Sequence, residues 1–332
     1  MAELPDDRVE PAPPFTNSAV DYFGPFIIKE GRKELKRYGV FFTCMASRAI
    51  HIEVAATLET DSFINALRRF LCRRGPIRQL RSDQGTNFVG ARRELKEGLD
   101  RLDHTRIRNE LQHHNCDWFV FDMNVPSASH MGGVWERQIR SVRNVLASLL
   151  QSNSTQLNEE SLSTLLCEAE ATVNSRPLTV DSLNDPLSPY PLTPNHLLTM
   201  KTKVVLPPPG VFQSADMYCR KRWRHVQHLA HEFWVRWKKE YLQSLQQRQR
   251  WTKPRRETCV GDVVIVKDND QPRNNWQLAR VVETYPSADG HVRKVKIAVA
   301  DRELDRSGKQ VRPTKFLERP VQKLVLLQEA ET

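Results

Sequence analysis

The order of apolar patterns in the first half of the chain restricts its fold more than any other feature. Three runs rich in β-branched and aromatic residues, Ala19–Ile28, Tyr38–Met45 and Ala49–Ala56, follow one another with only short turns between them, which is typical of antiparallel strands. Asp61–Arg73 then carries apolar residues at a helical period and ends before a Gly-Pro pair, which indicates a helix. This order predicts an α/β fold, with a mixed sheet and helices on both of its faces.

The remaining elements and the domain limits follow from similar patterns. We expect short strands at Ile77–Ser82 and Trp118–Asn124, a charged helix over Phe88–His114, and helices over Gly132–Leu150 and Glu159–Asn174. Short strands at Val260–Lys267, Gln277–Tyr285 and Val292–Val299 predict a small β-barrel. The expected domains are an extended lead-in (1–14), an α/β core (15–180), a Pro-rich linker (181–218), a basic helical connector (219–256), the barrel (257–327) and a tail (328–332).

Three acidic residues stand where an ordinary surface charge is not expected. Asp21 interrupts an apolar run, Asp83 ends a strand-like segment at a glycine turn, and Glu136 opens an amphipathic helix after two glycines. Carboxylates that converge from such elements could hold two hard divalent cations, which bind oxygen ligands. Two such ions activate an attacking oxygen and stabilise a leaving oxygen on phosphorus. The acids therefore point to a metal-dependent enzyme that acts on phosphodiesters.

The residues around these acids form three distinctive words. They read Val-Asp-Tyr-Phe-Gly-Pro-Phe (20–26), Ser-Asp-Gln-Gly-Thr-Asn-Phe (82–88) and Gly-Gly-Val-Trp-Glu-Arg (132–137). Residues 15–151, which contain all three words, resemble the catalytic core of retroviral and retrotransposon integrases, above all that of BEL/Pao-type LTR retrotransposons. A weaker resemblance, to the SH3-like barrel at the C-terminus of those integrases, covers residues 261–327.

This resemblance implies both a fold and an activity. The fold would be a ribonuclease H-like mixed five-stranded sheet flanked by helices, followed by a helical connector and a small SH3-like β-barrel. Asp21, Asp83 and Glu136 would be the catalytic residues and would hold two Mg²⁺ (or Mn²⁺) ions. The activity would be trimming of the 3′ ends of element DNA and strand transfer into target DNA. Glu136 follows Asp83 by 53 positions, a longer gap than in retroviral integrases, which fits the retrotransposon family.

Other polar residues near the acids are candidates for DNA contact. Arg140 and Arg143 lie at i+4 and i+7 from Glu136. One interpretation is a Glu–Arg pair on a solvated helix face, which stabilises the helix by about a few tenths of a kcal/mol. The other, which the resemblance implies, is that the two arginines bind DNA phosphates. Asn87 is a further candidate. Ser129 and His130 are others, with turn formation as the alternative for these two. The buried stripe of the same helix is expected to comprise Trp135, Ile139, Val142, Leu146 and Leu149.

The basic character of the chain is concentrated in one segment. Residues 219–256 carry twelve Lys or Arg against two Glu, a net charge of +10 that equals the net charge of the whole chain. Arg220, Lys221, Arg222 and Arg224 are the candidate phosphate contacts there. The apolar residues at helical spacing are expected to pack and not to stack on bases; they are Trp223, Val226, Ala230, Phe233, Trp237 and Tyr241. The three histidines of this segment drift around the helix, which disfavours a metal site.

Cysteine spacing and the lack of targeting signals suggest a compartment. The six cysteines are at least 28 residues apart, so neither a zinc knuckle nor a disulfide framework is indicated, and we expect buried, reduced thiols. Neither a signal peptide nor an apolar run of bilayer length is visible. We expect a protein that is not secreted, has no membrane partner, and is nuclear after a cytoplasmic pre-integration stage. No His or Cys precedes Asp21, so we expect a truncated piece with no zinc site.

The expected partners are double-stranded DNA, from element ends and from the target, and further copies of the chain assembled on that DNA. Two other interpretations are open on the sequence. One is a catalytically silent or domesticated DNA-binding remnant that lacks the zinc module. The other is a ribonuclease H-like nuclease that cuts DNA without joining it.

Overall fold

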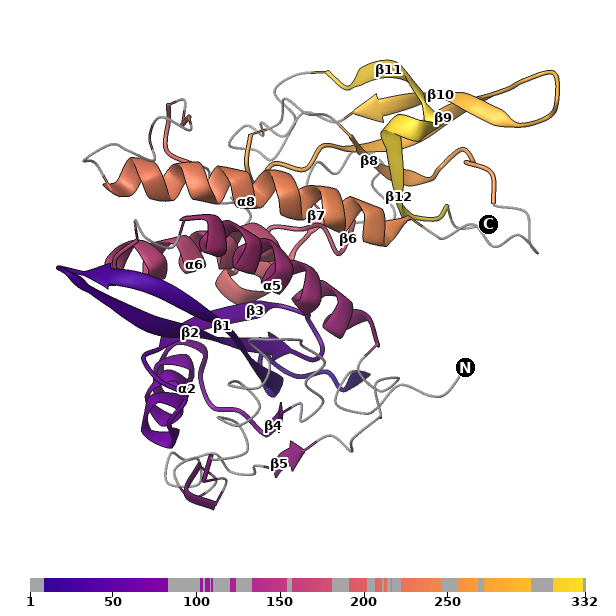
Figure 1. Ribbon diagram of the computed structural model, residues 1–332. Coiled ribbons are helices and arrows are strands. Elements are labelled where there is room, and N and C mark those ends of the chain that lie inside the picture. The colour runs from indigo at the N-terminus through magenta and orange to yellow at the C-terminus, as the bar shows by residue number, and fades with distance from the viewer. Residues whose placement is uncertain are drawn as a thin grey trace. The chain divides into compact units, whose positions relative to one another are not determined.

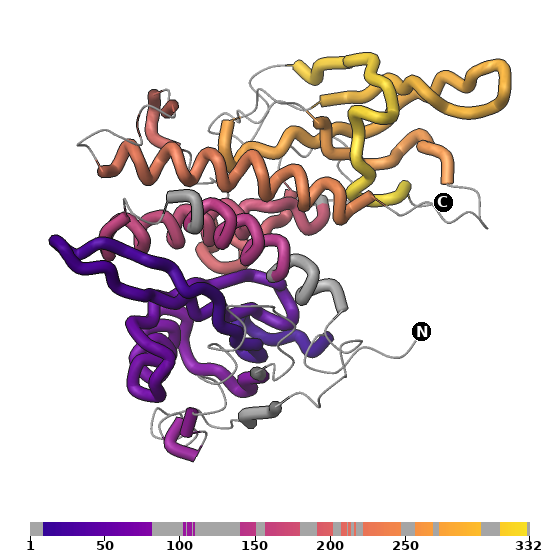
Figure 2. The backbone as a smooth tube through the Cα atoms, viewed as in Figure 1, coloured from indigo at the N-terminus to yellow at the C-terminus, as the bar shows by residue number. Residues whose placement is uncertain are grey.

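The computed structural model describes residues 9–82, 102–103, 105–107, 109, 120–123, 133–153, 157–180, 191–201, 207–210, 212–213, 216, 222–246, 256–267, 272–299 and 313–330; Figure 2 traces the backbone. For residues 120–123, 133–139, 151–153 and 180 it describes the backbone alone. The chain divides into two compact units. Unit 1 comprises Met1–Asn174 and Pro209–Trp237, and unit 2 comprises Ser175–Pro208 and Lys238–Thr332.

Unit 1 is built on a mixed sheet of five strands in the order β3-β2-β1-β4-β5 (Figure 1). The strands β1 (Asn17–Glu30), β2 (Lys33–Cys44) and β3 (Ile50–Ala55) form an antiparallel meander. The strands β4 (Gln79–Ser82) and β5 (Val120–Met123) run parallel to β1 on its other side. The predicted α/β architecture is confirmed. The predicted helix over 88–114 lies largely outside the described residues.

Helices cover both faces of this sheet, with α2 (Thr60–Arg74) on one face and α5 (Gly133–Asn153) and α6 (Glu159–Asn174) on the other (Figure 1). On the α2 side, Phe70 stacks on Phe42 of β2, with ring centroids 4.1 Å apart. On α5, three residues of the predicted stripe, Val142, Leu146 and Leu149, are buried. The side chains of Trp135 and Ile139 lie outside the described residues. Amphipathic periodicity therefore identified this helix and its buried face correctly.

Side chains from α6 cap the outer edge of β3. Asn174 accepts a hydrogen bond from the Ile50 N–H (2.9 Å) and donates one to the Ile50 carbonyl (2.8 Å). One turn earlier, Glu170 accepts from the Ile52 N–H (2.9 Å). An edge strand otherwise presents a row of unpaired backbone groups. Asn174 thus acts as a backbone substitute and ties α6 to the sheet.

We expect Asn174→Ala to lower the free energy of unfolding by about 2–3 kcal/mol, because both backbone groups of Ile50 would be left buried without a partner. Chemical denaturation followed by circular dichroism measures this loss. Thr164→Ala, at an exposed position of the same helix, serves as the control and should change stability by only about a few tenths of a kcal/mol. Equal losses in the two variants would contradict the capping role.

Helix α8 (Arg222–Leu245) begins in unit 1 and ends in unit 2. Within unit 1, Gln227 donates to Glu168 of α6 (2.7 Å), and Arg236 donates to Ser148 of α5 (3.4 Å). The predicted apolar seam is buried at Val226, Ala230, Phe233 and Trp237. The prediction is wrong for Trp223, whose side chain is 50% exposed, because it lies at the first turn of the helix, before the packed part begins.

Unit 2 includes part of the expected Pro-rich linker (181–218), where a strand and a short helix form, and the last residues of the expected core (15–180), where the partner strand lies. The strands β6 (Thr179–Val180) and β7 (Pro191–Leu192) pair with each other, and the short helix α7 (Pro194–Thr199) follows. Thr193 caps this helix by accepting from the His196 N–H (3.3 Å). Proline at the first helical position removes a donor that would have no partner there. Pro194 therefore starts a short helix within this stretch.

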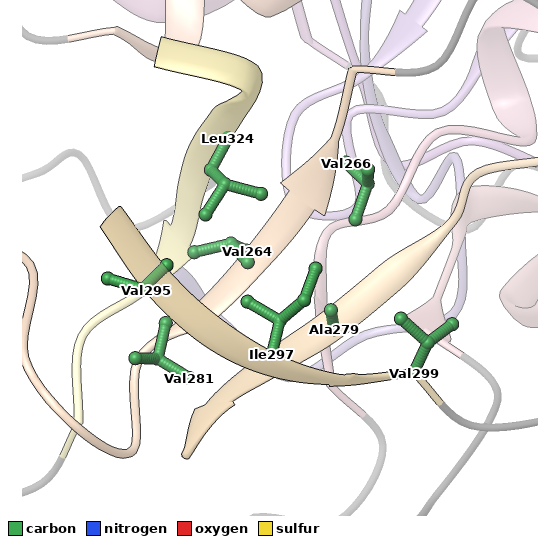
Figure 3. Close-up of a cluster of buried hydrophobic side chains, with 8 residues drawn as sticks. All are labelled: Val264, Val266, Ala279, Val281, Val295, Ile297, Val299 and Leu324. Carbon is green, nitrogen blue, oxygen red and sulfur yellow. The ribbon is translucent and has the colours of Figure 1, made fainter. Parts of the chain in front are cut away.

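The larger part of unit 2 is an antiparallel sheet of five strands in the order β11-β10-β9-β8-β12. These strands are β8 (Val263–Val266), β9 (Leu278–Pro286), β10 (Val292–Val299), β11 (Lys315–Pro320) and β12 (Leu324–Gln328), with a 3₁₀ turn (Val321–Lys323) before the last. Figure 3 shows its apolar core, in which Val295 and Ile297 of β10 are fully buried. Three of the strands were predicted, whereas β11 and β12 were not. Among the described residues, no helix is long and apolar enough to cross a membrane.

A buried carboxylate joins the two ends of this sheet region. The Asp262 side chain is 0% exposed. It accepts two hydrogen bonds from the Arg256 guanidinium (2.9 Å each), one from the Cys259 N–H (2.9 Å) and one from the Ala330 N–H (3.0 Å). A buried carboxylate is stable only when donors satisfy its oxygens. Asp262 therefore links the segment that enters β8 to the segment that leaves β12.

Candidate functional site

Asp21 lies in the middle of β1, the central strand of the unit 1 sheet. Side chains alternate between the two faces of a strand. Tyr22 points to the α2 side, where its ring lies 6.0 Å from that of Phe63, so Asp21 points to the side of α5. Its Oδ1 accepts a hydrogen bond from the Tyr22 N–H (2.7 Å), and the side chain is 19% exposed. The carboxylate therefore sits in a mostly buried position on the side of the sheet that faces α5.

The guanidinium of Arg143, on α5, forms an ion pair with Oδ2 of Asp21. The Arg143 side chain is only 12% exposed, whereas Arg140, almost one turn earlier on the same helix, is exposed. Arg143 therefore does not lie on a fully solvated face, and its DNA contact stays a prediction. A half-buried ion pair is screened less by solvent than a surface pair. The Asp21 carboxylate is thus neutralised by a side chain of α5.

Only part of the surroundings of the other two predicted acids is described. Val20, directly before Asp21, pairs with Ser82 of the parallel strand β4. Asp83 follows Ser82 in the chain and lies outside the described residues. Glu136 belongs to α5, and its side chain also lies outside them. Helical geometry places position 136 on the same stripe as position 143, about 10 Å closer to the start of the helix.

The ion pair between Asp21 and Arg143 joins β1 to α5, the helix that contains position 136. The strand β4, which ends directly before position 83, pairs with β1. Asn87, Ser129, His130, Arg220 and Lys221 lie outside the described residues, so their predicted DNA contacts stay predictions. Within the described part of the chain, no group of three or more His, Cys, Asp or Glu side chains is arranged to hold a metal ion.

The start of α8 carries a small cluster of charged and aromatic side chains. Arg224 pairs with Asp216 (2.7 Å from Nε to Oδ1) and lies over the rings of Phe212 and Trp223, 5.5 and 5.7 Å from their centroids. The hydrogen bonds from Arg224 lower the pKa of the Asp216 carboxyl. Arg222 is exposed. Of the predicted phosphate contacts described here, Arg222 is therefore available to a ligand, and Arg224 is held by protein partners.

Residues 221–327 match a family of unknown function (DUF5641). No curated protein matches the sequence. The solved structures that are similar include one described as a cryoEM structure of the simian T-cell lymphotropic virus intasome in complex with PP2A regulatory subunit B56 gamma. That similarity has a TM-score of 0.34 and 12% sequence identity, and it covers 97% of this chain and 85% of the other. A score at this level does not establish a shared fold.

The DUF5641 segment begins at α8 and extends through the sheet β8–β12. Its three helical histidines differ in environment: His225 is buried, His228 is half-buried and His231 is exposed. Burial, and to a lesser extent the charge of His228, lowers the pKa of His225. The three histidine side chains of the DUF5641 segment therefore lie in different surroundings.

A buried charge cluster at the other edge of the unit 1 sheet was not predicted. His51 of β3 is 3% exposed and lies between Glu53 (Nε2 to Oε1, 2.9 Å) and Glu170 of α6 (Nδ1 to Oε2, 3.3 Å). Three arginines of α2 complete the cluster: Arg69 and Arg73 pair with Glu53, and Arg74 pairs with Glu170. Its members are scattered from position 51 to position 170, so only the fold brings them together.

This cluster predicts a pH dependence for the stability of unit 1. Burial and, to a lesser extent, the charge of Arg74 favour neutral His51, but the hydrogen bonds to Glu170 and Glu53 and the charge of Glu170 outweigh them and raise the pKa of the imidazole. A raised pKa in the folded state means that the contribution of His51 is present at acidic pH and is lost as the pH rises through that pKa. We expect the free energy of unfolding to fall by on the order of 1 kcal/mol between pH 6 and pH 8.

His51→Gln should remove that slope, whereas the exposed His231→Gln should keep it. Urea unfolding at closely spaced pH values measures both. A wild-type slope that survives in His51→Gln would assign the effect to another group. Over this pH range Glu53 stays ionised, because contacts with His51 and Arg69 overcome the opposing effect of burial and lower its pKa.

The prediction of buried thiols is wrong for most of the described cysteines. Cys44 is buried, but Cys72, Cys167 and Cys259 are exposed, and all four are free thiols. Cys72 and Cys167 lie on α2 and α6, at positions that turn away from the sheet. The spacing of cysteines indicates whether they can pair, but it carries little information on burial.

Proposed function

We propose that this chain is an integrase-type, metal-dependent polynucleotidyl transferase of a BEL/Pao-like LTR retrotransposon. It would trim the 3′ ends of element DNA and join them to target DNA. The observation that carries the proposal is the position of Asp21, a mostly buried carboxylate on the central strand that faces α5, where it pairs with Arg143. The three sequence words that surround Asp21, Asp83 and Glu136 support the same assignment.

The sheet of unit 1 supports a ribonuclease H-like fold. That fold requires an antiparallel β1-β2-β3 meander with two further strands parallel to β1, and the order and directions found here agree with it. In it, the first acid lies on β1 and the second follows β4. Asp21 and Asp83 occupy these places in the sequence, and the pairing of Val20 with Ser82 brings the two strands together.

The donors fit Mg²⁺ or Mn²⁺. Hard cations prefer carboxylate oxygens, and the three residues that would hold two such ions, Asp21, Asp83 and Glu136, are all carboxylates. When bound, the ions supply Lewis-acid stabilisation of the attacking and leaving oxygens on phosphorus. The protein holds Oδ1 of Asp21 in place through the Tyr22 N–H. Arg143 approaches the same carboxylate from α5, and Arg140 is exposed one turn away for contact with a phosphate.

The remainder of the chain would bind DNA. Arg222 is exposed at the start of a helix in the basic segment 219–256, and cationic side chains in such numbers bind phosphates without sequence preference. We propose that the sheet β8–β12 forms the SH3-like barrel of the family and that the protein acts as a homo-oligomer on double-stranded DNA. A nuclear location, after a cytoplasmic stage, follows from this role.

Strand transfer by the purified full chain tests this function. The assay uses a labelled duplex with the element-end sequence, a supercoiled target, and Mg²⁺ or Mn²⁺, with chelator as one control and Asp83→Asn as the other. Joined products from the wild type, absent in both controls, would establish an integrase. Salt-sensitive DNA binding without reaction would instead identify a DNA-binding remnant. Cleavage without joined products would identify a nuclease.

A further inference from the structure

If Asp21 is a metal ligand, which rests on the proposed function, the contact between Arg143 and Asp21 competes with metal binding. The guanidinium lies against Oδ2, one of the two oxygens that a divalent cation would use. A guanidinium and a divalent cation repel each other, and at so short a distance in a mostly buried place the repulsion is only partly screened. The Arg143 guanidinium and a divalent cation therefore compete for Oδ2 of Asp21.

We propose that Arg143 is an internal counter-ion of Asp21 that a divalent cation must displace, and that the displaced guanidinium then binds a DNA phosphate. Arg143 is thus a positioning residue that links the metal site to the nucleic acid. The pairing keeps a buried carboxylate neutralised until the metal arrives, because an unpaired charge at 19% exposure is costly.

The place of Arg143 on α5 permits this exchange. A long side chain on a helix leans toward the start of that helix, which is the direction of Arg140 and Glu136. The planar fork of arginine binds carboxylate and phosphate with similar geometry, so one group can replace the other as its partner. Arg140 is exposed on the same stripe, which identifies the side from which a phosphate approaches.

Two linked equilibria follow from the exchange. A divalent cation binds Asp21 more weakly while Arg143 is present, and a phosphate that draws Arg143 away strengthens metal binding. Linkage is reciprocal, so the metal must also strengthen the binding of DNA. Neither effect is expected if Arg143 merely braces α5 against β1.

Calorimetric titration of the full chain with Mn²⁺ alone, without DNA, tests the first equilibrium. We expect Arg143→Gln to raise the Mn²⁺ affinity roughly tenfold, because the amide still donates to Asp21 but carries no charge. Arg143→Lys, which keeps the charge, should stay near the wild type. Arg32→Gln, in the exposed turn between β1 and β2, is the control for a general loss of positive charge and should change the affinity by no more than about twofold. Unchanged or weaker Mn²⁺ binding by folded Arg143→Gln would overturn the proposal.

The second equilibrium needs no variant. A short duplex of unrelated sequence should raise the Mn²⁺ affinity of the wild type several-fold, and Arg143→Gln should lose most of that gain. The absence of any coupling in the wild type would overturn the proposal even if Arg143→Gln failed to fold. Asp21→Asn separates this result from the proposed function. If it binds Mn²⁺ as well as the wild type does, the metal site itself is misplaced; if it loses Mn²⁺ while Arg143→Gln behaves like the wild type, only the counter-ion role fails.

Discussion

Asp21→Asn is expected to lower strand transfer by about three orders of magnitude, which corresponds to about 4 kcal/mol of transition-state stabilisation. Asparagine has nearly the same shape and still accepts a hydrogen bond from the Tyr22 N–H, so β1 should form as before. It lacks the charge that a divalent cation requires. The loss should therefore appear in the rate and not in the fold, and joined products quantified over time measure it.

A matched carboxylate on the same strand provides the control. Glu30, at the exposed end of β1, should tolerate Glu30→Gln with unchanged activity, because it lies far along the strand from Asp21. Circular dichroism and thermal melting of Asp21→Asn should show a folded protein. Joining by Asp21→Asn at a rate within tenfold of the wild type would remove Asp21 from the site.

Asp262→Ala is expected to destabilise unit 2 by about 3–5 kcal/mol, the usual cost of removing one partner of a buried charge pair. The substitution leaves the half-buried Arg256 guanidinium and the N–H groups of Cys259 and Ala330 without the carboxylate that now accepts from all of them. Asp262→Asn should cost less, because its carbonyl oxygen retains part of the acceptor role. Urea denaturation followed by tryptophan fluorescence should show an earlier transition for unit 2.

An exposed ion pair in the same sheet region provides the control for Asp262→Ala. Asp289, in the turn between β9 and β10, pairs with Arg293 of β10. Surface pairs of this kind contribute little, so Asp289→Ala should leave the transition nearly unchanged. The pKa of Asp262 is lowered, because the hydrogen bonds from Arg256, Cys259 and Ala330 outweigh its burial. The contribution of Asp262 to the stability of unit 2 is therefore fully present above the ordinary pKa of an aspartate. It is lost as the pH falls from there through the lowered pKa of the folded state. Equal effects of Asp262→Ala and Asp289→Ala would contradict this account.

The sequence was most informative where one element repeats a strong pattern. The helix predicted at Glu159–Asn174 has these bounds in the structure, and the α5 stripe is buried at each position whose side chain is described. Both follow from a helical period of apolar residues, which is a local property. The β1-β2-β3 meander is similarly local, because short turns leave adjacent strands little choice but to pair.

The sequence was least informative where several distant elements combine. The His51 cluster draws its charges from β3, α2 and α6, and none of these residues stands in an unusual local pattern. The ion pair between Asp21 and Arg143 spans 122 positions. Helical spacing placed Arg143 beside the buried stripe but could not show which strand it would meet. The strands β6 and β7 are two residues long, too short for a period-2 pattern to appear.

The capped edge of β3 also limits how copies of this protein can assemble. The backbone groups of Ile50, Ile52 and Val54 that face away from β2 are held by side chains of Asn174, Glu170 and Arg69. A strand from a second molecule that added to this edge would have to break all three contacts. Continuous sheets across a dimer are therefore disfavoured at β3, and an oligomer that forms on DNA has to use other surfaces than this edge. Peptides designed to block assembly by strand addition would fail at this edge.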